Sequence, residues 1–206
     1  MSWKNKLKLY VITDGRFIDE VKGAMLALEG GATTIQLRMK NSPTRKMIEV
    51  GREIRKLTKE YDALFIVNDR VDVALATDAD GVHLGQEDMP IDVAREIVGD
   101  IIIGISASNL REAMEAEKNG ADYIGAGSVF PTTTKEDARY LGLDGLKEVV
   151  SKVRIPVVAI GGITLENVNK VLETGVQGIA VISAIMGATD VKKAASLMRK
   201  IIDKKI

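Results

Sequence analysis

The sequence predicts a (β/α)8 barrel that forms a single domain over residues 1–206. Three observations lead to this fold class. Short runs of β-branched and other apolar residues, bounded by Gly, Asn, Asp or Pro, occur eight times, as expected for buried strands. Longer segments with apolar residues three or four positions apart separate these runs, as expected for helices. Eight such strand–helix units fit a chain of 206 residues near the lower size limit of the barrel.

The expected strands follow one another with room for one helix between most of them. They are residues 9–13, 34–38, 64–68, 81–84, 101–106, 123–129, 156–160 and 178–182. Strands that are joined through helices run parallel, so this order predicts a parallel sheet. A doubly wound open sheet is the alternative, but it usually has fewer strands. Its first strand–helix turn often carries G-x-G-x-x-G, whereas the turn here reads ITDGRF.

Capping residues mark the expected helix ends. A helix with an apolar stripe runs from Pro43, in its first turn, to Tyr61. The expected N-caps are Ser42, Asn109 and Thr164. The expected glycine stops are Gly120 and Gly175. The last helix carries apolar residues on one face from Val191 to Ile202 and lysines on the other.

Composition excludes several classes of function. The 29 Lys and Arg residues balance 29 Asp and Glu residues, which argues against coating of nucleic acid or of an anionic membrane. The chain has no cysteine, so disulfides, thiolate nucleophiles, cysteine–zinc sites and iron–sulfur clusters are excluded. No segment approaches the roughly 20 apolar residues that span a bilayer. The apolar run near the N-terminus is too short for a signal peptide, so we expect a cytoplasmic protein.

Polar side chains gather where the expected strands end, and the active site of this barrel lies at that end. The second strand ends in Gln36, Arg38 and Lys40, which alternate and therefore point to one side. Lys135 lies among threonines in the loop after the sixth strand. Cations together with hydroxyls predict a site for phosphate or diphosphate, with solvated surface charge as the alternative.

Asp69 and Asp88 form a candidate Mg2+ site, because they follow adjacent strands about 4.8 Å apart. Two carboxylates this close repel each other unless a proton or a cation lies between them. Mg2+ favours one or two carboxylates together with substrate phosphates. The alternative is that each aspartate caps the helix that follows it.

The loops after the seventh and eighth strands form a second candidate phosphate site. They carry Gly161 and Gly162 in one loop and Ile182 and Ser183 in the other. In this barrel these loops often bind phosphate through backbone N–H groups, and glycine allows the anion a close approach.

Few residues near the strand ends suit proton transfer. Ser106 has no obvious base beside it, which favours a hydrogen-bonding role over a nucleophilic one. His83 is interpreted as a structural histidine, with a catalytic role as the alternative, and Tyr10 as a packing residue. Two phosphate zones with a cation site therefore favour departure of a diphosphate over acyl transfer or proton abstraction.

The chain resembles the thiamine phosphate synthase family over nearly its whole length. The matching segments are, in family order, LYVITD, QLRMK, VND, GVHLGQED, IGIS, GSVFPTTTK, VAIGGI and VISAI. The family has a (β/α)8 barrel, which agrees with the strand count. The resemblance implies a transferase that joins 4-amino-5-hydroxymethyl-2-methylpyrimidine diphosphate to 4-methyl-5-(2-phosphoethyl)thiazole and releases thiamine phosphate and diphosphate. In the family mechanism diphosphate leaves first, and the thiazole nitrogen captures the pyrimidine methyl cation.

The resemblance also implies a role for each matching residue. The pyrimidine diphosphate would be held by Gln36, Arg38, Lys40, Asn68, Ser106 and Lys135. The thiazole phosphate would be held by Thr132, Thr134, Gly162, Ile182 and Ser183. The metal ligands of Mg2+ would be Asp69 and Asp88, and the residues expected to act in catalysis are Arg38, Ser106 and Lys135.

Two rival functions are compatible with the barrel. A thiazole tautomerase would use a proton-shuttling residue and need no Mg2+ pair, and the presence of Asp69, Asp88 and Lys135 argues against it. A non-catalytic phosphometabolite-binding protein would need only the last two loops. The expected partners are small-molecule substrates rather than nucleic acid or membrane, and a homo-oligomer is compatible with the sequence.

Overall fold

Eight parallel strands close into a barrel in the computed structural model, which describes residues 2–132 and 139–206. The strands are β1 (Leu9–Ile12), β2 (Thr34–Leu37), β3 (Leu64–Asn68), β4 (Gly81–Leu84), β5 (Ile102–Ala107), β6 (Tyr123–Ala126), β7 (Val157–Ile160) and β8 (Gly178–Val181). Each strand pairs with the next along the chain, and β1 pairs with β8, so the sheet has no open edge. The predicted barrel is confirmed, and the doubly wound alternative is wrong.

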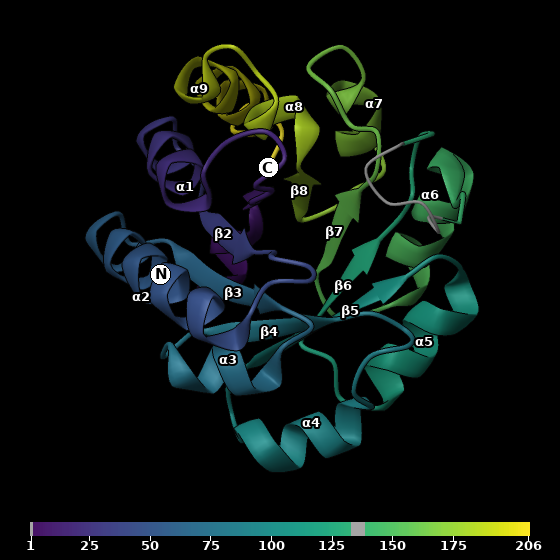
Figure 1. Cartoon of the computed structure of the whole chain (residues 1–206). Helices are drawn as coiled ribbons and strands as arrows, with labels where there is room; N and C mark the ends of the chain where they lie inside the picture. Colours follow the sequence, from purple (N-terminus) through teal and green to yellow (C-terminus); the bar gives the residue numbers. More distant parts are fainter. Residues whose placement is uncertain (1, 133–138) are drawn as a thin grey trace.

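Helices surround the strands on the outside of the barrel (Figure 1). They are α1 (Glu20–Glu29), α2 (Thr44–Glu60), α3 (Val71–Ala76), α4 (Ile91–Val98), α5 (Leu110–Lys118), α6 (Gly142–Lys152), α7 (Val168–Leu172), α8 (Ser183–Met186) and α9 (Val191–Ile202). A 3-10 helix, η1 (Trp3–Leu7), precedes β1. Across the described residues, none of the helices has the length and apolar character needed to cross a membrane.

The helix caps agree with the sequence at α5 and differ at α2. The side chain of Asn109 accepts a hydrogen bond from the backbone N–H of Glu112, so the predicted cap of α5 is confirmed. The predicted cap of α2 by Ser42 is wrong. Pro43 occupies the N-cap position in an extended conformation, with no side-chain hydrogen bond to the helix.

The start of α7 also differs from the prediction. Thr164 does not cap this helix, which begins four residues later with Asn167 in the N-cap position. Asn167 accepts a hydrogen bond from the Thr164 N–H and donates one to the carbonyl of Gly162, which holds the preceding residues in a turn. The predicted stop at Gly175 agrees with its φ of +87°, a conformation that favours glycine.

Apolar side chains form two cores, one on each side of the sheet. Strand side chains alternate, so Phe65 and Val67 belong to the outer core beneath the helices, whereas Ile66 belongs to the inner core. The inner core consists of Leu7, Tyr10, Ile12, Leu64, Ile66, Tyr123, Val158 and Ala180. Leu7 of η1 is fully buried there, so η1 closes the N-terminal end of the barrel. The opposite end carries the polar residues.

Candidate active site

A cavity of about 410 Å3 lies at the C-terminal ends of the strands, and every strand contributes to its wall. Its volume suits a small-molecule ligand. The predicted site residues that line it are Gln36, Arg38, Lys40, Asn68, Asp69, Asp88, Ser106, Thr132, Gly162, Ile182 and Ser183. Thr134 and Lys135 lie outside the described residues. The structure therefore brings these predicted site residues together at one open end of the barrel. Their contacts with substrate stay predictions.

Arg38 is held at the end of β2 by a buried carboxylate that sequence reasoning missed. Asp14 is 3% exposed and lies 3.5 Å from Nη1 of Arg38. Arg16 also donates hydrogen bonds to Asp14 from its backbone N–H and from its guanidinium, where Nε lies at 2.9 Å and Nη2 at 2.6 Å. The hydrogen-bonded Arg16 guanidinium holds the pKa of Asp14 below its usual range. The signal in the sequence was an aspartate two residues after β1, at the rim that carries Arg38.

Asp69 and Asp88 line the cavity beside each other, at the ends of β3 and β4. Burial, a hydrogen bond with the Asp88 carboxyl group and its charge raise the pKa of Asp69 to about 6, against the opposing effect of Lys40 and Arg38. Neither aspartate is a helix cap, because Arg70 precedes α3 and Pro90 precedes α4. The alternative reading as caps is wrong.

This carboxylate pair has the chemistry of a magnesium site. It offers oxygen ligands in a partly buried setting where two negative charges repel, and a divalent cation removes that repulsion. No cluster of three or more His, Cys, Asp or Glu ligands occurs in the ranges 2–132 and 139–206. Two carboxylates alone suit Mg2+, which keeps several waters and takes further ligands from substrate phosphates.

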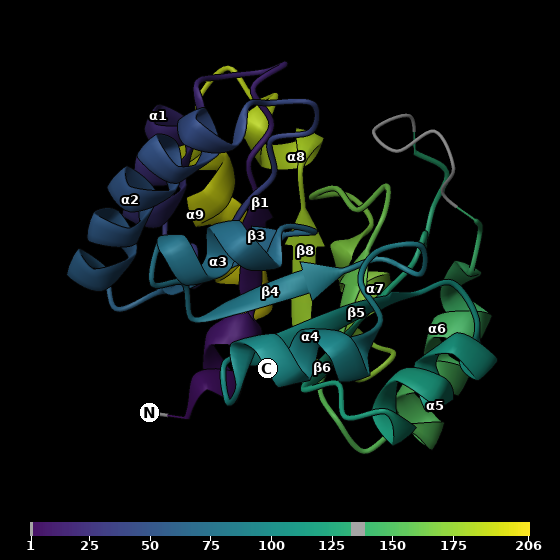
Figure 2. The same ribbon diagram turned by 60° about the horizontal axis from the view of Figure 1, so that its bottom comes forward.

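The loops after β7 and β8 line the opposite side of the cavity. Gly161 and Gly162 have φ of +104° and +63°, values that residues with a side chain rarely adopt. Ser183 is exposed and is the first residue of α8, which begins at the tip of β8 (Figure 2). The first backbone N–H groups of a helix have no carbonyl acceptor within the helix, so they are available to hydrogen-bond a ligand. This arrangement suits a phosphate group.

A buried glutamate lies where β5 passes into α5. Glu112 is 6% exposed, lines the cavity, and accepts hydrogen bonds from the N–H and hydroxyl of Ser108. Burial acts to raise the pKa of Glu112, but these bonds and one with Asn109 outweigh it, so the pKa lies below its ordinary value. Arg139 approaches Glu112 at 3.7 Å. Sequence reasoning missed both residues, since Glu112 reads as an ordinary residue of a helix's first turn.

The floor of the cavity is polar and joins residues from five strands. The Gln36 amide donates to the Tyr10 hydroxyl, which lies 2.8 Å from the Tyr123 hydroxyl. The His83 ring lies between Tyr123 and Ser106, with 2.9 Å to each. Tyr10 packs in the inner core as expected, but its hydroxyl group faces this polar floor. Tyr123 was expected only as the first residue of a strand, and it also lines the cavity. The sequence alone carried no signal that pairs residues 113 positions apart.

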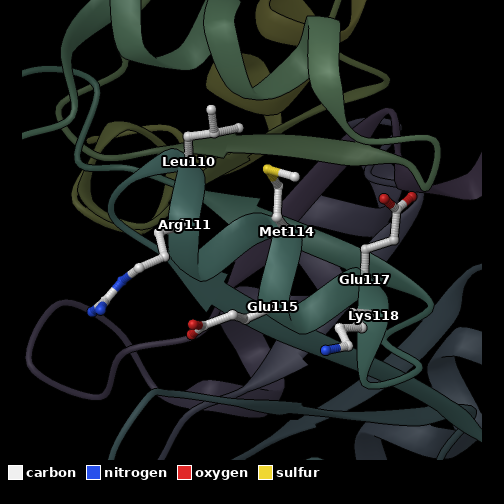
Figure 3. Close-up of a pocket in the computed structure, with 6 residues that line it drawn as sticks. All are labelled: Leu110, Arg111, Met114, Glu115, Glu117 and Lys118. Atoms are coloured by element: carbon white, nitrogen blue, oxygen red, sulfur yellow. The ribbon is translucent and has the colours of Figure 1, made fainter.

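A second hollow, of about 550 Å3, lies on the outer surface of α5 (Figure 3). Its lining residues are Leu110, Arg111, Met114, Glu115, Glu117 and Lys118. All six belong to one helix, and no strand end reaches them. The mouth cavity, with its carboxylates, cations and buried hydroxyls, is therefore the candidate active site despite its smaller volume.

A family model, curated relatives and a solved structure at 63% identity all point to one family. A family described as thiamine monophosphate synthase matches residues 9–185. The chain is 66% identical to a thiamine-phosphate synthase of Pyrococcus furiosus over 203 residues, covering 98% of each protein. It is 58% identical to one of Methanococcus vannielii over 206 residues, covering 100% of each. A solved structure of a thiamine phosphate pyrophosphorylase from Pyrococcus furiosus superposes with a TM-score of 0.97 at 63% identity, covering 100% of both chains.

Proposed function

The chain belongs to the thiamine monophosphate synthase family, and on that premise we propose how its barrel mouth carries out the coupling reaction. The enzyme is a transferase, a thiamine-phosphate synthase. It joins 4-amino-5-hydroxymethyl-2-methylpyrimidine diphosphate to 4-methyl-5-(2-phosphoethyl)thiazole and gives thiamine phosphate and diphosphate. We propose in addition that residues at the barrel mouth bind both substrates, that the metal is Mg2+ and that the protein is cytoplasmic.

One observation supports the proposed arrangement: two groups of polar residues, which we call the two arcs, face each other across one cavity. Arg38, Asp69 and Asp88 follow β2, β3 and β4. Gly162 and Ser183 follow β7 and β8, on the other side of the closed ring. We assign the pyrimidine diphosphate to the first arc and the thiazole phosphate to the second. The carbon that loses diphosphate and the nitrogen that attacks it then meet in the middle.

Departure of diphosphate is the demanding step, because negative charge builds on the leaving oxygen. Arg38 and Lys40 supply positive charge to that group, and Asp14 keeps the Arg38 guanidinium in its place. Gln36 and Ser106 hold the pyrimidine ring by hydrogen bonds. The carbon–oxygen bond breaks first, and the thiazole nitrogen then forms the carbon–nitrogen bond with its own lone pair. No base is needed for that attack, because the nitrogen carries no hydrogen that must be removed.

Asp69 and Asp88 would hold Mg2+. When bound, the ion supplies charge neutralisation to the departing diphosphate. The raised pKa of Asp69 supports the assignment. It arises from burial and then from Asp88, and a bound cation would offset both effects on the carboxylate.

A four-part incubation tests the function. The protein is mixed with both substrates and Mg2+, and then in turn without the pyrimidine diphosphate, without the thiazole phosphate, or with EDTA. We expect equimolar thiamine phosphate and diphosphate only when both substrates and Mg2+ are present. Conversion between thiazole isomers without coupling would support the tautomerase instead. Binding of phosphates without any product would support the non-catalytic rival.

The role of Arg38 is tested by Arg38→Gln against a matched control, Arg154→Gln. Arg154 is exposed and precedes β7 at the closed end of the barrel, far from the mouth. Loss of a charge-assisted hydrogen bond to the leaving group is expected to lower kcat by roughly tenfold to a hundredfold. The control is expected to keep wild-type kcat. Equal kcat in both variants would remove Arg38 from the leaving-group site.

A further inference from the structure

A chain of four hydrogen bonds crosses the floor of the cavity, and charge neutralisation at the leaving group does not account for it. Nε2 of Gln36 donates to the Tyr10 hydroxyl at 2.6 Å, and the Tyr10 and Tyr123 hydroxyls lie 2.8 Å apart. The Tyr123 hydroxyl lies 2.9 Å from Nδ1 of His83, and Nε2 of His83 lies 2.9 Å from Oγ of Ser106. Both ends of the chain are residues assigned to the pyrimidine.

Two strand glycines make room for the rings of this chain. A Cβ atom on Gly104 would lie 2.1 Å from the Tyr123 ring, and one on Gly125 would lie 2.8 Å from Cε1 of His83. Glycine inside a strand weakens it, and it marks places where another group approaches closely. The Tyr123 ring also packs against the rings of Tyr10 and His83, at centroid distances of 6.1 and 5.5 Å. The rings are therefore fixed in position. The direction of each hydrogen bond in the chain then depends on where the hydroxyl and imidazole hydrogens lie.

The available hydrogens allow only one consistent assignment of donor and acceptor in these four hydrogen bonds. A tyrosine hydroxyl has one hydrogen, and a neutral imidazole has one N–H. Burial raises the pKa of both tyrosines, so both hydroxyls keep their hydrogen. Tyr10 already accepts from Gln36, and in the described part of the chain its one remaining partner is the Tyr123 hydroxyl, so Tyr10 donates to Tyr123. Tyr123 then gives its own hydrogen to Nδ1 of His83.

The reverse order would leave a hydrogen without an acceptor. If Tyr123 donated to Tyr10, then the Tyr10 hydroxyl would accept twice, and its hydrogen would have no acceptor among the described residues. A buried donor without a partner is costly. With Nδ1 accepting, the imidazole hydrogen lies on Nε2 and is donated to Ser106.

We propose that this chain holds His83 as the neutral tautomer with hydrogen on Nε2, and that Ser106 is thereby presented as a hydrogen-bond donor to a ring nitrogen of the aminopyrimidine. His83 is a positioning residue, because it acts through Ser106. The oxygen of Ser106 accepts from His83, so the Ser106 hydrogen is left for the cavity. The identity of the ligand rests on the proposed function, whereas the tautomer of His83 does not.

The tautomer is directly measurable, because His83 is the one histidine of the chain. Protein labelled with 15N in histidine gives a two-bond 1H–15N spectrum with a single imidazole, in which the bare and the protonated nitrogen are distinguished. We expect a bare Nδ1 and a protonated Nε2 in the substrate-free enzyme at neutral pH. A protonated Nδ1, or a mixture of tautomers, would overturn the proposal.

Two conservative variants test the order of the chain. Tyr123→Phe removes the donor to Nδ1 and is expected to give a mixture of tautomers. Tyr10→Phe leaves Tyr123 able to donate to His83, and the wild-type tautomer is expected to persist. The same tautomer in all three proteins would contradict control by Tyr123. If Tyr123→Phe does not fold, the spectra of the wild-type protein and of Gln36→Glu still test the proposal.

Gln36→Glu tests the direction of the hydrogen bonds from the Gln36 end of the chain. The new carboxylate can only accept from the Tyr10 hydroxyl, which reverses each later bond and transfers the imidazole hydrogen to Nδ1. We expect the spectrum to switch tautomer. An unchanged spectrum would contradict transmission along the chain.

Kinetics connect the tautomer to the substrate. Tyr123→Phe is expected to lower kcat/KM for the pyrimidine diphosphate about tenfold, the loss of one ordinary hydrogen bond, with KM for the thiazole phosphate unchanged. Tyr61→Phe, at the exposed end of α2, is expected to match wild type. Equal losses for both substrates would indicate a merely structural role. A wild-type enzyme that makes thiamine phosphate with the wrong tautomer would refute this inference alone, and an enzyme that makes none would refute the proposed function.

Discussion

Replacing Asp69 with asparagine is expected to stabilise the metal-free protein at neutral pH. The pKa of Asp69 is raised from 3.8 to about 6, chiefly by burial and then by Asp88. The folded protein therefore binds this proton more tightly than the unfolded chain does. The folded state loses stability as pH rises through the window between these two values, and the full loss is present above about pH 6.

The size of the effect follows from the shift. Two pKa units correspond to about 2.7 kcal/mol, and solvent screening at a half-buried site reduces this to about 1–2 kcal/mol. Asparagine carries no charge, keeps the shape, and tolerates the left-handed backbone of this position, where φ is +61°. We therefore expect Asp69→Asn to be more stable than wild type by that amount at pH 7.5, and equal to it near pH 4.

Urea denaturation in EDTA at the two pH values measures this difference. Asp100→Asn, in an exposed position before β5, is the matched control and is expected to follow wild type at both. Addition of Mg2+ is expected to stabilise wild type and to have little effect on Asp69→Asn, because a ligand stabilises only the state that binds it. A variant that is no more stable than wild type at pH 7.5 would refute the claim of a repelling carboxylate pair.

Three further substitutions test other parts of the mouth. Ser183→Asp is expected to weaken thiazole phosphate binding roughly tenfold by charge repulsion while sparing pyrimidine diphosphate, and calorimetry with both affinities unchanged would remove Ser183 from the site. Asp14→Asn is expected to raise KM for pyrimidine diphosphate several-fold and to cost about 0.5–1 kcal/mol of stability at pH 7, since Arg16 is largely exposed. Because the pKa of Asp14 is lowered, this cost should shrink as pH falls through 3.8 and below, and a cost independent of pH would argue against the ion pair. Gly104→Ala is expected to cost about 1–3 kcal/mol through overlap with the Tyr123 ring, and unchanged urea stability would show that the ring has room to move.

The barrel was predictable because its determinants are local and repeated. Each strand is a short β-branched run, and the strict alternation with helices leaves few arrangements open to a parallel sheet. Helix ends were less predictable, since Pro43 and Asn167 occupy the positions assigned to Ser42 and Thr164. The four-residue helix α8 is too short to show a period at all.

The candidate site was predictable to the extent that strand ends converge in this fold. Arg38, Asp69 and Ser106 reach one cavity because each lies at or near the C-terminal end of its strand, and these ends meet at one side of the barrel. The contacts between distant residues were not predictable. Tyr10 and Tyr123 meet across the barrel interior through the stagger of the sheet and the space left by glycine, and neither leaves a local pattern in the sequence.

The most direct test of the account is a crystal structure of the enzyme with thiamine phosphate, diphosphate and Mg2+. We expect the diphosphate beside Arg38 and Lys40, with the metal ion between it and the carboxylates of Asp69 and Asp88. The phosphate of thiamine phosphate is expected at the loops of Gly162 and Ser183. Diphosphate bound in those loops instead, or a metal ion away from both aspartates, would contradict the assignment of the two arcs.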